Sequence, residues 1–289
     1  MRERGQQGVG QSNFAGETYE MGLEMTTESS RMSAGLADDY RGRSVFISGG
    51  SSGVGAALGH LLAGYGARVA LFARTQHRLD AVVDKIASTG ATALAVAGDV
   101  RRSADVAAAM ATAIDRFGRI DVAVACAGIG DRRPLEELDD ASWDAYIDTN
   151  LTGAFWVCRA AGLHMRANGG GSIVTVGSGL GLVGMAGQVA YCASKGGMVL
   201  MTKALAAELA PTVRVNCLAP GGIETPMTDN DFAVTDDPVE ARRLALKRVP
   251  LGRFATSEEV ARAIAWVASG QFSYATGSIV SMDGGTTAV

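Results

Sequence analysis

Cysteine, histidine and lysine are scarce in this chain of 289 residues, and each shortage narrows the possible functions. The 4 Cys lie far apart with no CxxC pair, which is typical of reduced thiols in a cytosolic protein. The 3 His form no metal-ligand spacing, so we expect no metal site. Only 4 of the basic residues are Lys, so each Lys is worth examining for a particular role.

The chain also lacks a long apolar run and an excess of positive charge. No stretch approaches the roughly 18 apolar residues of a membrane span, and the opening MRERGQQGVGQ is followed by no apolar segment typical of a signal peptide. The formal net charge is −4 and the pI is near 5.5, whereas a nucleic-acid-binding surface usually needs a basic stripe. We therefore expect a cytoplasmic protein that binds neither nucleic acid nor membrane.

Apolar residues make up 47% of the chain, enough for a large core, and from Tyr40 onward they alternate between two patterns. Short apolar, β-branched runs predict strands, and stretches with a helical period predict helices between them. Such alternation predicts an α/β protein with a single-domain Rossmann fold, a doubly wound parallel β-sheet flanked by helices, over 40–289. Residues 1–39 are rich in Gly, Gln, Ser, Thr and Glu without a period, and we expect a flexible N-terminal tail there. The expected strands are 43–48, 68–73, 93–97, 120–125, 172–176, 213–218 and 278–281, and the expected helices are 54–65, 75–88, 104–117, 140–165, 189–209 and 257–268.

A glycine-rich loop, SGGSSGVG, lies between the first expected strand and its helix. Its glycines, Gly49, Gly53 and Gly55, follow a G-x-x-x-G-x-G spacing. Glycine lets the backbone approach a pyrophosphate, and the helix N-terminus that follows favours negative charge. The alternative is a simple tight turn. The position at the first strand-to-helix turn favours a dinucleotide site.

The end of the second expected strand, Phe72-Ala73-Arg74-Thr75, bears on the choice of dinucleotide. A carboxylate there would bind the ribose 2′-hydroxyl of NAD, whereas an Arg accommodates the 2′-phosphate of NADP. No acid is present, and the planar guanidinium of Arg74 suits a phosphate, with Ser51 and Ser52 as further donors. The sequence thus predicts NADP(H) in preference to NAD(H). The alternative is an Arg74 that is simply a solvated surface residue.

Tyr191 and Lys195, in the segment YCASK, lie one helical turn apart. About 0.08 such pairs are expected by chance from the composition, so the pair is suggestive and needs partners. A carbonyl that accepts a hydride must also receive a proton, and a free Tyr with a pKa near ~10 is a poor acid at neutral pH. A neighbouring ammonium favours the phenolate, so we expect Lys195 to lower the pKa of Tyr191.

Together with further motifs in the same order, these features resemble the short-chain dehydrogenase/reductase family over Tyr40 to Val289, and in particular its 3-oxoacyl-acyl-carrier-protein-reductase branch. Gly98-Asp99-Val100 is similar to the stretch that holds adenine. Ala125-Cys126-Ala127-Gly128 stands where the family usually has Asn-Asn-Ala-Gly, a change that affects local contacts in the sheet. Pro220-Gly221-Gly222-Ile223-Glu224-Thr225 is similar to the loop that holds the nicotinamide carboxamide.

The resemblance implies a site for each part of the reaction. A catalytic role is implied for Asn150, which would hold a proton-relaying water, for Ser178, which would bind the substrate oxygen, and for Tyr191 and Lys195. The implied cofactor-binding residues are Gly49, Ser51, Ser52, Gly53, Val54, Gly55, Arg74, Asp99, Val100, Ala127, Gly128, Tyr191, Lys195, Pro220, Gly221, Ile223 and Thr225. The substrate-binding candidates are Ser178, Gly179, Leu180, Met185, Tyr191, Gly222 and Met227.

These features predict an NADP(H)-dependent oxidoreductase that reduces a ketone to a secondary alcohol. The alternatives are an alcohol or steroid dehydrogenase acting oxidatively with NAD(P)+, and a catalytically idle NADP-binding sensor. The segment 227–250, with acids before bases, predicts a helix over the substrate, whose charges complement the helix dipole. The resemblance further implies a homo-oligomer, a dimer or tetramer paired through the helices at 140–165 and 189–209; the alternative is that their small apolar faces pack only on the sheet.

Overall fold

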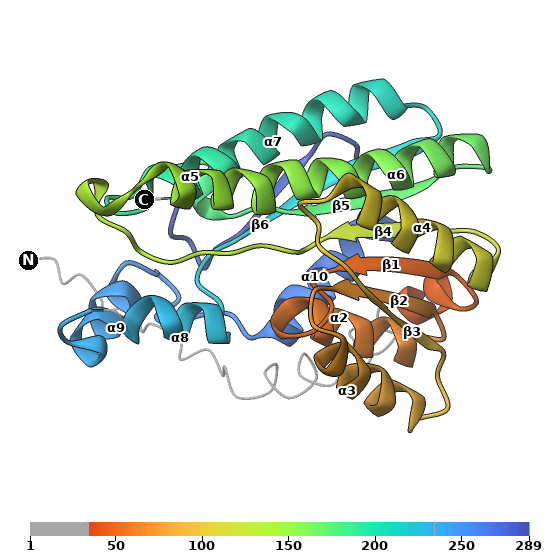
Figure 1. Cartoon of the computed structure of the whole chain (residues 1–289), viewed down its shortest axis with the longest axis horizontal. Coiled ribbons are helices and arrows are strands. Elements are labelled where there is room, and N and C mark those ends of the chain that lie inside the picture. The colour runs from red at the N-terminus through yellow and green to blue at the C-terminus, as the bar shows by residue number, and fades with distance from the viewer. Residues whose placement is uncertain (1–34, 234, 289) are drawn as a thin grey trace, which may run out of the picture.

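Seven parallel strands form the centre of the molecule, in the order β3-β2-β1-β4-β5-β6-β7 (Figure 1). The computed structural model describes residues 35–233 and 235–288. The order turns back on itself at β1, as the sequence predicts for a doubly wound sheet, and β1 and β4 lie side by side there. The strands are β1 Ser44–Ser48, β2 Arg68–Ala73, β3 Ala93–Ala97, β4 Val122–Ala125, β5 Gly171–Val176, β6 Val213–Pro220 and β7 Ile279–Met282.

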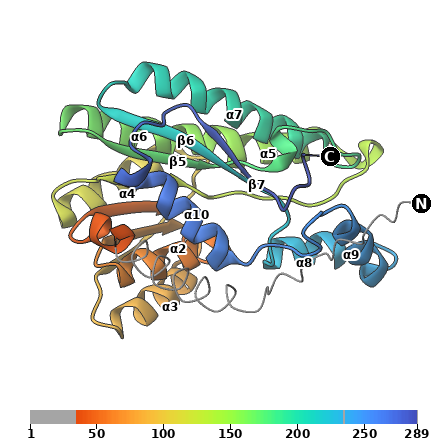
Figure 2. The same ribbon diagram turned by 180° about the vertical axis from the view of Figure 1, so that it is seen from behind.

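Helices cover both faces of the sheet (Figures 1 and 2). One core cluster joins the sheet to α2, α3 and α10, and the other joins it to α4, α6 and α7. Because both faces are covered, the strands are apolar along their length rather than alternating, and every residue of β1 is buried. The helices are α2 Gly53–Gly64, α3 Gln76–Ala87, α4 Ser103–Phe117, α5 Asp140–Tyr146, α6 Gly153–Ala167, α7 Val189–Leu209, α8 Pro226–Ala233, α9 Pro238–Lys247 and α10 Ser257–Ala268.

The single helix predicted over 140–165 is wrong in one respect. A π-helical segment, Ile147–Thr152, separates α5 from α6. The wider π turn changes the rotation of α6 relative to α5, and such insertions are frequent at functional sites. Asn150 lies within this segment and is completely buried.

The segment between β6 and α10 folds into two short helices, α8 and α9, rather than the one helix predicted over 227–250. Both lie beyond the ends of the strands, apart from the helical layers (Figure 1). They share a small apolar cluster of their own, built on Phe232, Val249 and Phe254. The predicted charge arrangement is present in α9, where the Asp237 carboxylate accepts from the backbone N–H of Glu240 and Lys247 lies in the last turn.

Residues 35–40 form a short helix before β1, and Leu36 and Tyr40 of this helix are buried. The Tyr40 hydroxyl donates to the backbone oxygen of Ala265 at 2.7 Å, which ties this turn to α10. The predicted tail, 1–39, lies largely outside the described residues, as does Val289. Among the helices that the structure describes, none is long and apolar enough to cross a membrane.

Candidate active site

A cleft of about 320 Å³ opens at the carboxyl ends of the central strands. Ligands of doubly wound sheets bind at this edge, where the strand order reverses. Every residue predicted to bind the cofactor lines the cleft, from the glycine loop after β1 to the segment after β6: Gly49, Ser51, Ser52, Gly53, Val54, Gly55, Arg74, Asp99, Val100, Ala127, Gly128, Tyr191, Lys195, Pro220, Gly221, Ile223 and Thr225.

The glycine loop leaves room for an anion against the N-terminus of α2. Gly49 has a φ of +76°, and a Cβ at Gly55 would lie 2.3 Å from the backbone oxygen of Gly49, so neither position accommodates a side chain. Ser52, at the N-cap of α2, makes no side-chain hydrogen bond to the helix. The first N–H groups of the helix therefore lack a side-chain cap, as a pyrophosphate site requires.

A buried hydroxyl connects this loop to the end of β4. Ser48 Oγ donates to the backbone oxygen of Val124 at 3.4 Å and accepts from the backbone N–H groups of Cys126 and Ala127 at 3.2 and 3.3 Å. Cys126 stands where the family usually has Asn. Burial raises the pKa of its thiol to about 11, so this thiol remains protonated and serves as a neutral wall of the cleft.

Charged residues line the far end of the cleft. The Asp99 carboxylate is already paired with Arg101 at 2.6 Å, and this hydrogen-bonded pairing holds the pKa of Asp99 below its usual value. Arg74 is exposed and lines the cleft, and among the described residues no hydrogen bond or ion pair engages its guanidinium. Arg78 lies beside the same cleft. The free positive charge at this end therefore comes from arginine.

Helix α7 places Tyr191 and Lys195 at the base of the cleft, on one face. Lys195 is 5% exposed, and its Nζ donates to the backbone oxygen of Val176 at 2.8 Å, at the end of β5. Nζ lies 5.7 Å from the centroid of the Tyr191 ring. Burial lowers the pKa of Lys195 to about 8, because the charged ammonium has lost its water.

Burial dominates the pKa of Tyr191, and it raises that pKa above the ordinary value near 10. A hydrogen bond with the Ser178 hydroxyl opposes this shift. The predicted lowering by Lys195 is not seen in this geometry, because the ammonium is directed to Val176 and is itself weakly basic. Ser178 lies just beyond β5, where its Oγ also accepts from the backbone N–H of Leu180 at 3.1 Å.

Asn150 fixes the loop after β4 beside these groups. Its Oδ1 accepts from the backbone N–H of Ile129 at 2.8 Å, and its Nδ2 donates to the Ile129 oxygen at 3.0 Å and to Ser194 Oγ at 3.1 Å. Ser194 Oγ in turn donates to the backbone oxygen of Tyr191 at 2.8 Å. The π segment, the loop and α7 are thus joined through one amide.

A second, larger cavity of about 860 Å³ adjoins the cleft. All the predicted substrate-binding residues line it: Ser178, Gly179, Leu180, Met185, Tyr191, Gly222 and Met227. Four residues, Ser178, Tyr191, Gly221 and Met227, line both spaces. No sequence pattern identifies Arg132 and Gln188 as lining residues, because nothing in the sequence places them beside this cavity. The segment predicted to lie over the substrate, 227–250, does contribute to the lining, through Met227, Thr228, Asp231 and Phe232 of α8 and Ala241, Leu244 and Ala245 of α9.

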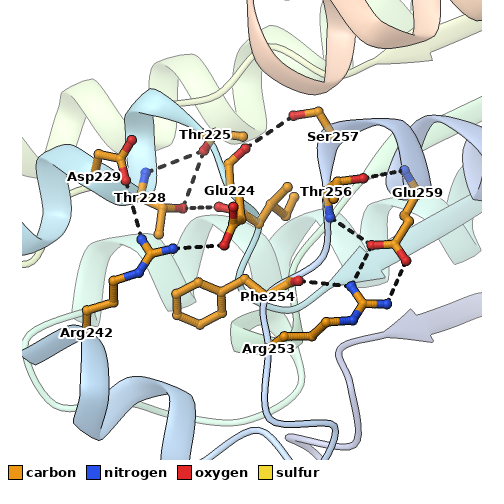
Figure 3. Close-up of polar contacts among 11 residues, drawn as sticks. Glu224, Thr225, Thr228, Asp229, Arg242, Arg253, Phe254, Thr256, Ser257 and Glu259 are labelled. Carbon is orange, nitrogen blue, oxygen red and sulfur yellow. Dashed lines mark hydrogen bonds and ion pairs between the residues drawn. The ribbon is translucent and has the colours of Figure 1, made fainter.

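A polar network fixes the segment that bounds both spaces (Figure 3). Thr228 Oγ1 donates to the backbone oxygen of Ile223 at 2.6 Å, which closes the turn into α8. Arg242 of α9 pairs with Glu224 at 2.8 Å and with Asp229 at 3.5 Å, and its guanidinium lies 5.3 Å from the centroid of the Phe254 ring. The network therefore ties α8 and α9 to the loop after β6.

A cleft at the point where the strand order reverses, which adjoins an apolar cavity at a Ser and a Tyr and has a Lys at its base, is typical of a dehydrogenase or reductase. The family model of short chain dehydrogenases matches residues 43–235. The chain is 40% identical over 256 residues to the cis-4-hydroxycyclohexanecarboxylate dehydrogenase of Sinomonas cyclohexanicum, across 88% of this chain and 100% of that protein. It is 39% identical to the 3-oxoacyl-[acyl-carrier-protein] reductase of Thermotoga maritima, across 84% and 97% of the two chains.

The solved structures agree with the sequences. The crystal structure of levodione reductase matches with a TM-score of 0.83 at 33% identity, over 86% of this chain and 99% of that one. The chain therefore belongs to the short-chain dehydrogenase/reductase family. It is an oxidoreductase that acts on CH–OH and C=O groups with a nicotinamide dinucleotide, and the predicted fold and family are confirmed.

Proposed function

We propose that this protein is an NADP(H)-dependent ketoreductase, which reduces a ketone to a secondary alcohol. The observation that carries the proposal is that Ser178 and Tyr191 line both the dinucleotide cleft and the apolar cavity. A carbonyl placed in the cavity beside these hydroxyls would also adjoin the cleft. The cavity volume, about 860 Å³, suits a substrate of drug-like size with an apolar body.

The nicotinamide, when bound, supplies the hydride to the carbonyl carbon. Tyr191 lies where its O–H can donate the proton to the oxygen, and its raised pKa keeps the phenol protonated at neutral pH. Ser178 holds the same oxygen by a hydrogen bond as negative charge develops there. Lys195 holds the end of β5 through Val176 and has further N–H donors that can reach the ribose hydroxyls.

Asn150 has one free site for the proposed proton-relaying water. Both of its N–H donors are used by Ile129 and Ser194, and Oδ1 accepts one bond from Ile129. The second lone pair of Oδ1 remains for a water between Asn150 and Lys195. A Cβ on Gly128 would meet Asn150 Oδ1 at 3.3 Å and Lys195 Nζ at 3.7 Å, so Gly128 borders the space between them.

Arg74 supports NADP(H) over NAD(H), because its guanidinium follows β2 without a hydrogen bond or ion pair to the described residues and β2 itself ends without an acidic residue. The test is kcat/KM for NADPH and for NADH in the wild type and in Arg74→Glu. A charge-assisted hydrogen bond is worth about 1.5–3 kcal/mol, so we expect NADPH to lose about 10- to 100-fold. Arg116→Glu, at an exposed arginine of α4 outside the cleft, is the matched control. A wild type that prefers NADH would contradict the assignment.

A panel of ketones and secondary alcohols, followed by NADPH absorbance, tests the reaction and its direction. The dehydrogenase names of some relatives favour the oxidative reaction as the second candidate. Turnover of alcohols with little reduction of ketones would support it. Stabilisation by the cofactor without turnover of any compound would instead indicate a binding protein.

The proposal includes a cytoplasmic homo-oligomer paired through α6 and α7. Several apolar side chains of these helices, such as Ala161 and Met198, are buried, but Leu163 and Leu200 are 43% and 68% exposed. Apolar side chains on one outer face suit a partner subunit. Sedimentation of the wild type and of Leu200→Glu tests the pairing: loss of the dimer or tetramer in the variant would support it.

A further inference from the structure

We propose that Gln188 and Asp231 form an acceptor subsite for a substrate hydroxyl, so that the ketone carries a hydroxyl group remote from the carbonyl that is reduced. The inference rests on the proposed ketoreductase function and deepens it. Both residues line the larger cavity, together with Ser178 and Tyr191. They come from different elements, Gln188 from the N-cap of α7 and Asp231 from α8.

The cavity wall around the two residues is mostly apolar. Leu180, Val183, Met185, Phe232 and Leu244 all contribute to it. The carboxylate of Asp283 also lines the cavity but is already used by hydrogen bonds to Gly285 and Thr287. Unused acceptors are therefore scarce along this wall.

Gln188 is a buried amide without a partner. The residue is 8% exposed, and its Oε1 is buried and accepts no hydrogen bond from the described residues. Its backbone is fully used, since the N–H donates to Met185 at 3.1 Å and the oxygen accepts from Cys192 at 2.8 Å. The side chain is thus held beside the cavity by its own main chain, three residues before Tyr191, with its acceptor capacity free.

Asp231 is the second unsatisfied acceptor. Its carboxylate accepts from the backbone N–H of Arg132, but its Oδ1 is buried and has no partner within the described chain. Burial raises the pKa of this carboxyl, and the Arg132 charge opposes the shift. The charge of Asp231 also contributes to the raised pKa of Tyr191, which means that the carboxyl lies within electrostatic range of the phenol.

A buried acceptor without a hydrogen-bond donor destabilises the protein by about 1–3 kcal/mol. A ligand that donates to this acceptor recovers that free energy when it binds. Both an ammonium group and a hydroxyl group can be this donor. The guanidinium groups of Arg132 and Arg248 line the same cavity and oppose a positively charged ligand. A neutral hydroxyl group donates its one hydrogen bond to either acceptor without this repulsion.

The test uses linear methyl ketones that end in a hydroxyl, a methyl or an ammonium group, matched in chain length. The full-length wild type, Gln188→Leu, Asp231→Leu and the control Asn230→Leu are compared by kcat/KM. Asn230 lies on the same helix as Asp231, is exposed and does not line the cavity. A site built to bind a hydroxyl discriminates strongly against its absence, so we expect at least about a tenfold preference for the hydroxyl ketone at the best chain length. The ratio of kcat/KM for the hydroxyl ketone to kcat/KM for the methyl ketone should approach one in the two cavity variants. In the control variant this ratio should stay as in the wild type.

A second measurement separates this inference from the proposed reaction. Calorimetric titration of the protein compares binding of a terminal diol with that of the matched mono-alcohol. If ketones are reduced without preference for the hydroxyl, or the ammonium ketone is preferred, the subsite is wrong and the ketoreductase function stands. In another outcome, no ketone is reduced, but the diol binds more tightly than the mono-alcohol, and only the two cavity variants abolish this difference in affinity. That outcome supports the subsite and shows that the proposed reaction is wrong. Equal binding of both alcohols without any turnover overturns both.

Discussion

Asn150 and Ile129 are joined by a closed pair of hydrogen bonds, in which the buried amide of Asn150 accepts from the Ile129 N–H at 2.8 Å and donates to the Ile129 oxygen at 3.0 Å. The Asn150 side chain thus makes the two hydrogen bonds to the Ile129 backbone that a neighbouring strand would make in a sheet. The loop that follows β4 is thereby held in place next to Lys195, and the π segment that carries Asn150 is required for the pairing.

Asn150→Ala should therefore lower both stability and turnover. It leaves the N–H and C=O of Ile129 unpaired in a partly buried site, which costs about 1–3 kcal/mol in the free energy of unfolding. Urea denaturation measures that loss. Asn168→Ala is the control, because this exposed amide bonds to His164 at the surface and its removal should cost little. Equal stability of Asn150→Ala and wild type would contradict the bracing role.

Tyr191→Phe should abolish reduction while it preserves cofactor binding. Removing the proton donor lowers kcat by about 10²- to 10⁴-fold, because the ring remains and only the acid is lost. Fluorescence titration with NADPH should give a dissociation constant within about twofold of the wild type, since that factor is only about 0.4 kcal/mol. Tyr65→Phe, at a tyrosine outside both cavities, should leave both values unchanged. Near-normal turnover in Tyr191→Phe would remove Tyr191 from the acid role.

Lys195→Met should be inactive and yet more stable at pH 7. The pKa of Lys195 falls from 10.5 to about 8 on folding, so the buried charge costs roughly 3 kcal/mol wherever the folded state is protonated. Loss of the bond to Val176 offsets about 1 kcal/mol of the relief.

The stability difference between the wild type and Lys195→Met should depend on pH in a predictable direction. Between pH 8 and 10.5 the unfolded chain keeps the proton that the folded chain releases, so the contribution of Lys195 to the unfolding free energy becomes more favourable as the pH rises. The higher unfolding free energy of Lys195→Met relative to the wild type should therefore shrink between pH 8 and 10.5, and the wild type should become the more stable near pH 10.5. Lys203→Met, at an exposed lysine, should show no such trend in parallel thermal melts. A constant difference at every pH would contradict the buried charge.

Arg242→Ala should weaken substrate binding more than stability. The ion pairs of Arg242 with Glu224 and Asp229 are partly exposed and contribute about 0–1 kcal/mol, so the melting temperature should change little. They tie α9 to the loop that borders the substrate cavity, and their loss should raise the KM for substrate severalfold. The control is Arg243→Ala, whose partner Glu240 lies within α9 itself. Equal KM values in the two variants would show that the tie is unimportant.

The sequence predicted the sheet and the residues that line the cleft, for a physical reason. Strands buried on both faces and a glycine turn such as Gly49 to Gly55 leave local patterns, and the carboxyl ends of parallel strands meet at one edge. Their positions along the chain therefore determine their positions in space.

The features that the sequence analysis missed depend on distant segments. The π turn at Asn150 adds a residue to a helix without a change in apolar pattern, so 140–165 was predicted as one helix. Gln188 and Asp231 line a common cavity only because the fold brings the N-terminus of α7 and one side of α8 to the same space. The pKa of Tyr191 likewise depends on burial and on the direction of the Lys195 ammonium, neither of which follows from a spacing of one turn.

The separate apolar cluster of Phe232, Val249 and Phe254 makes the α8–α9 segment a replaceable unit. The sheet and the glycine loop form their cores without it, while this unit supplies much of the outer wall of the substrate cavity. Ile223 and Ala255 pair in a short parallel bridge at the base of this segment. Exchange of α8 and α9 within it, with Thr225 of the cofactor cleft kept, would alter substrate choice at little cost to the rest of the fold. Proteins with this fold can therefore differ in substrate through exchange of these two helices, while the residues that line the cofactor cleft stay the same.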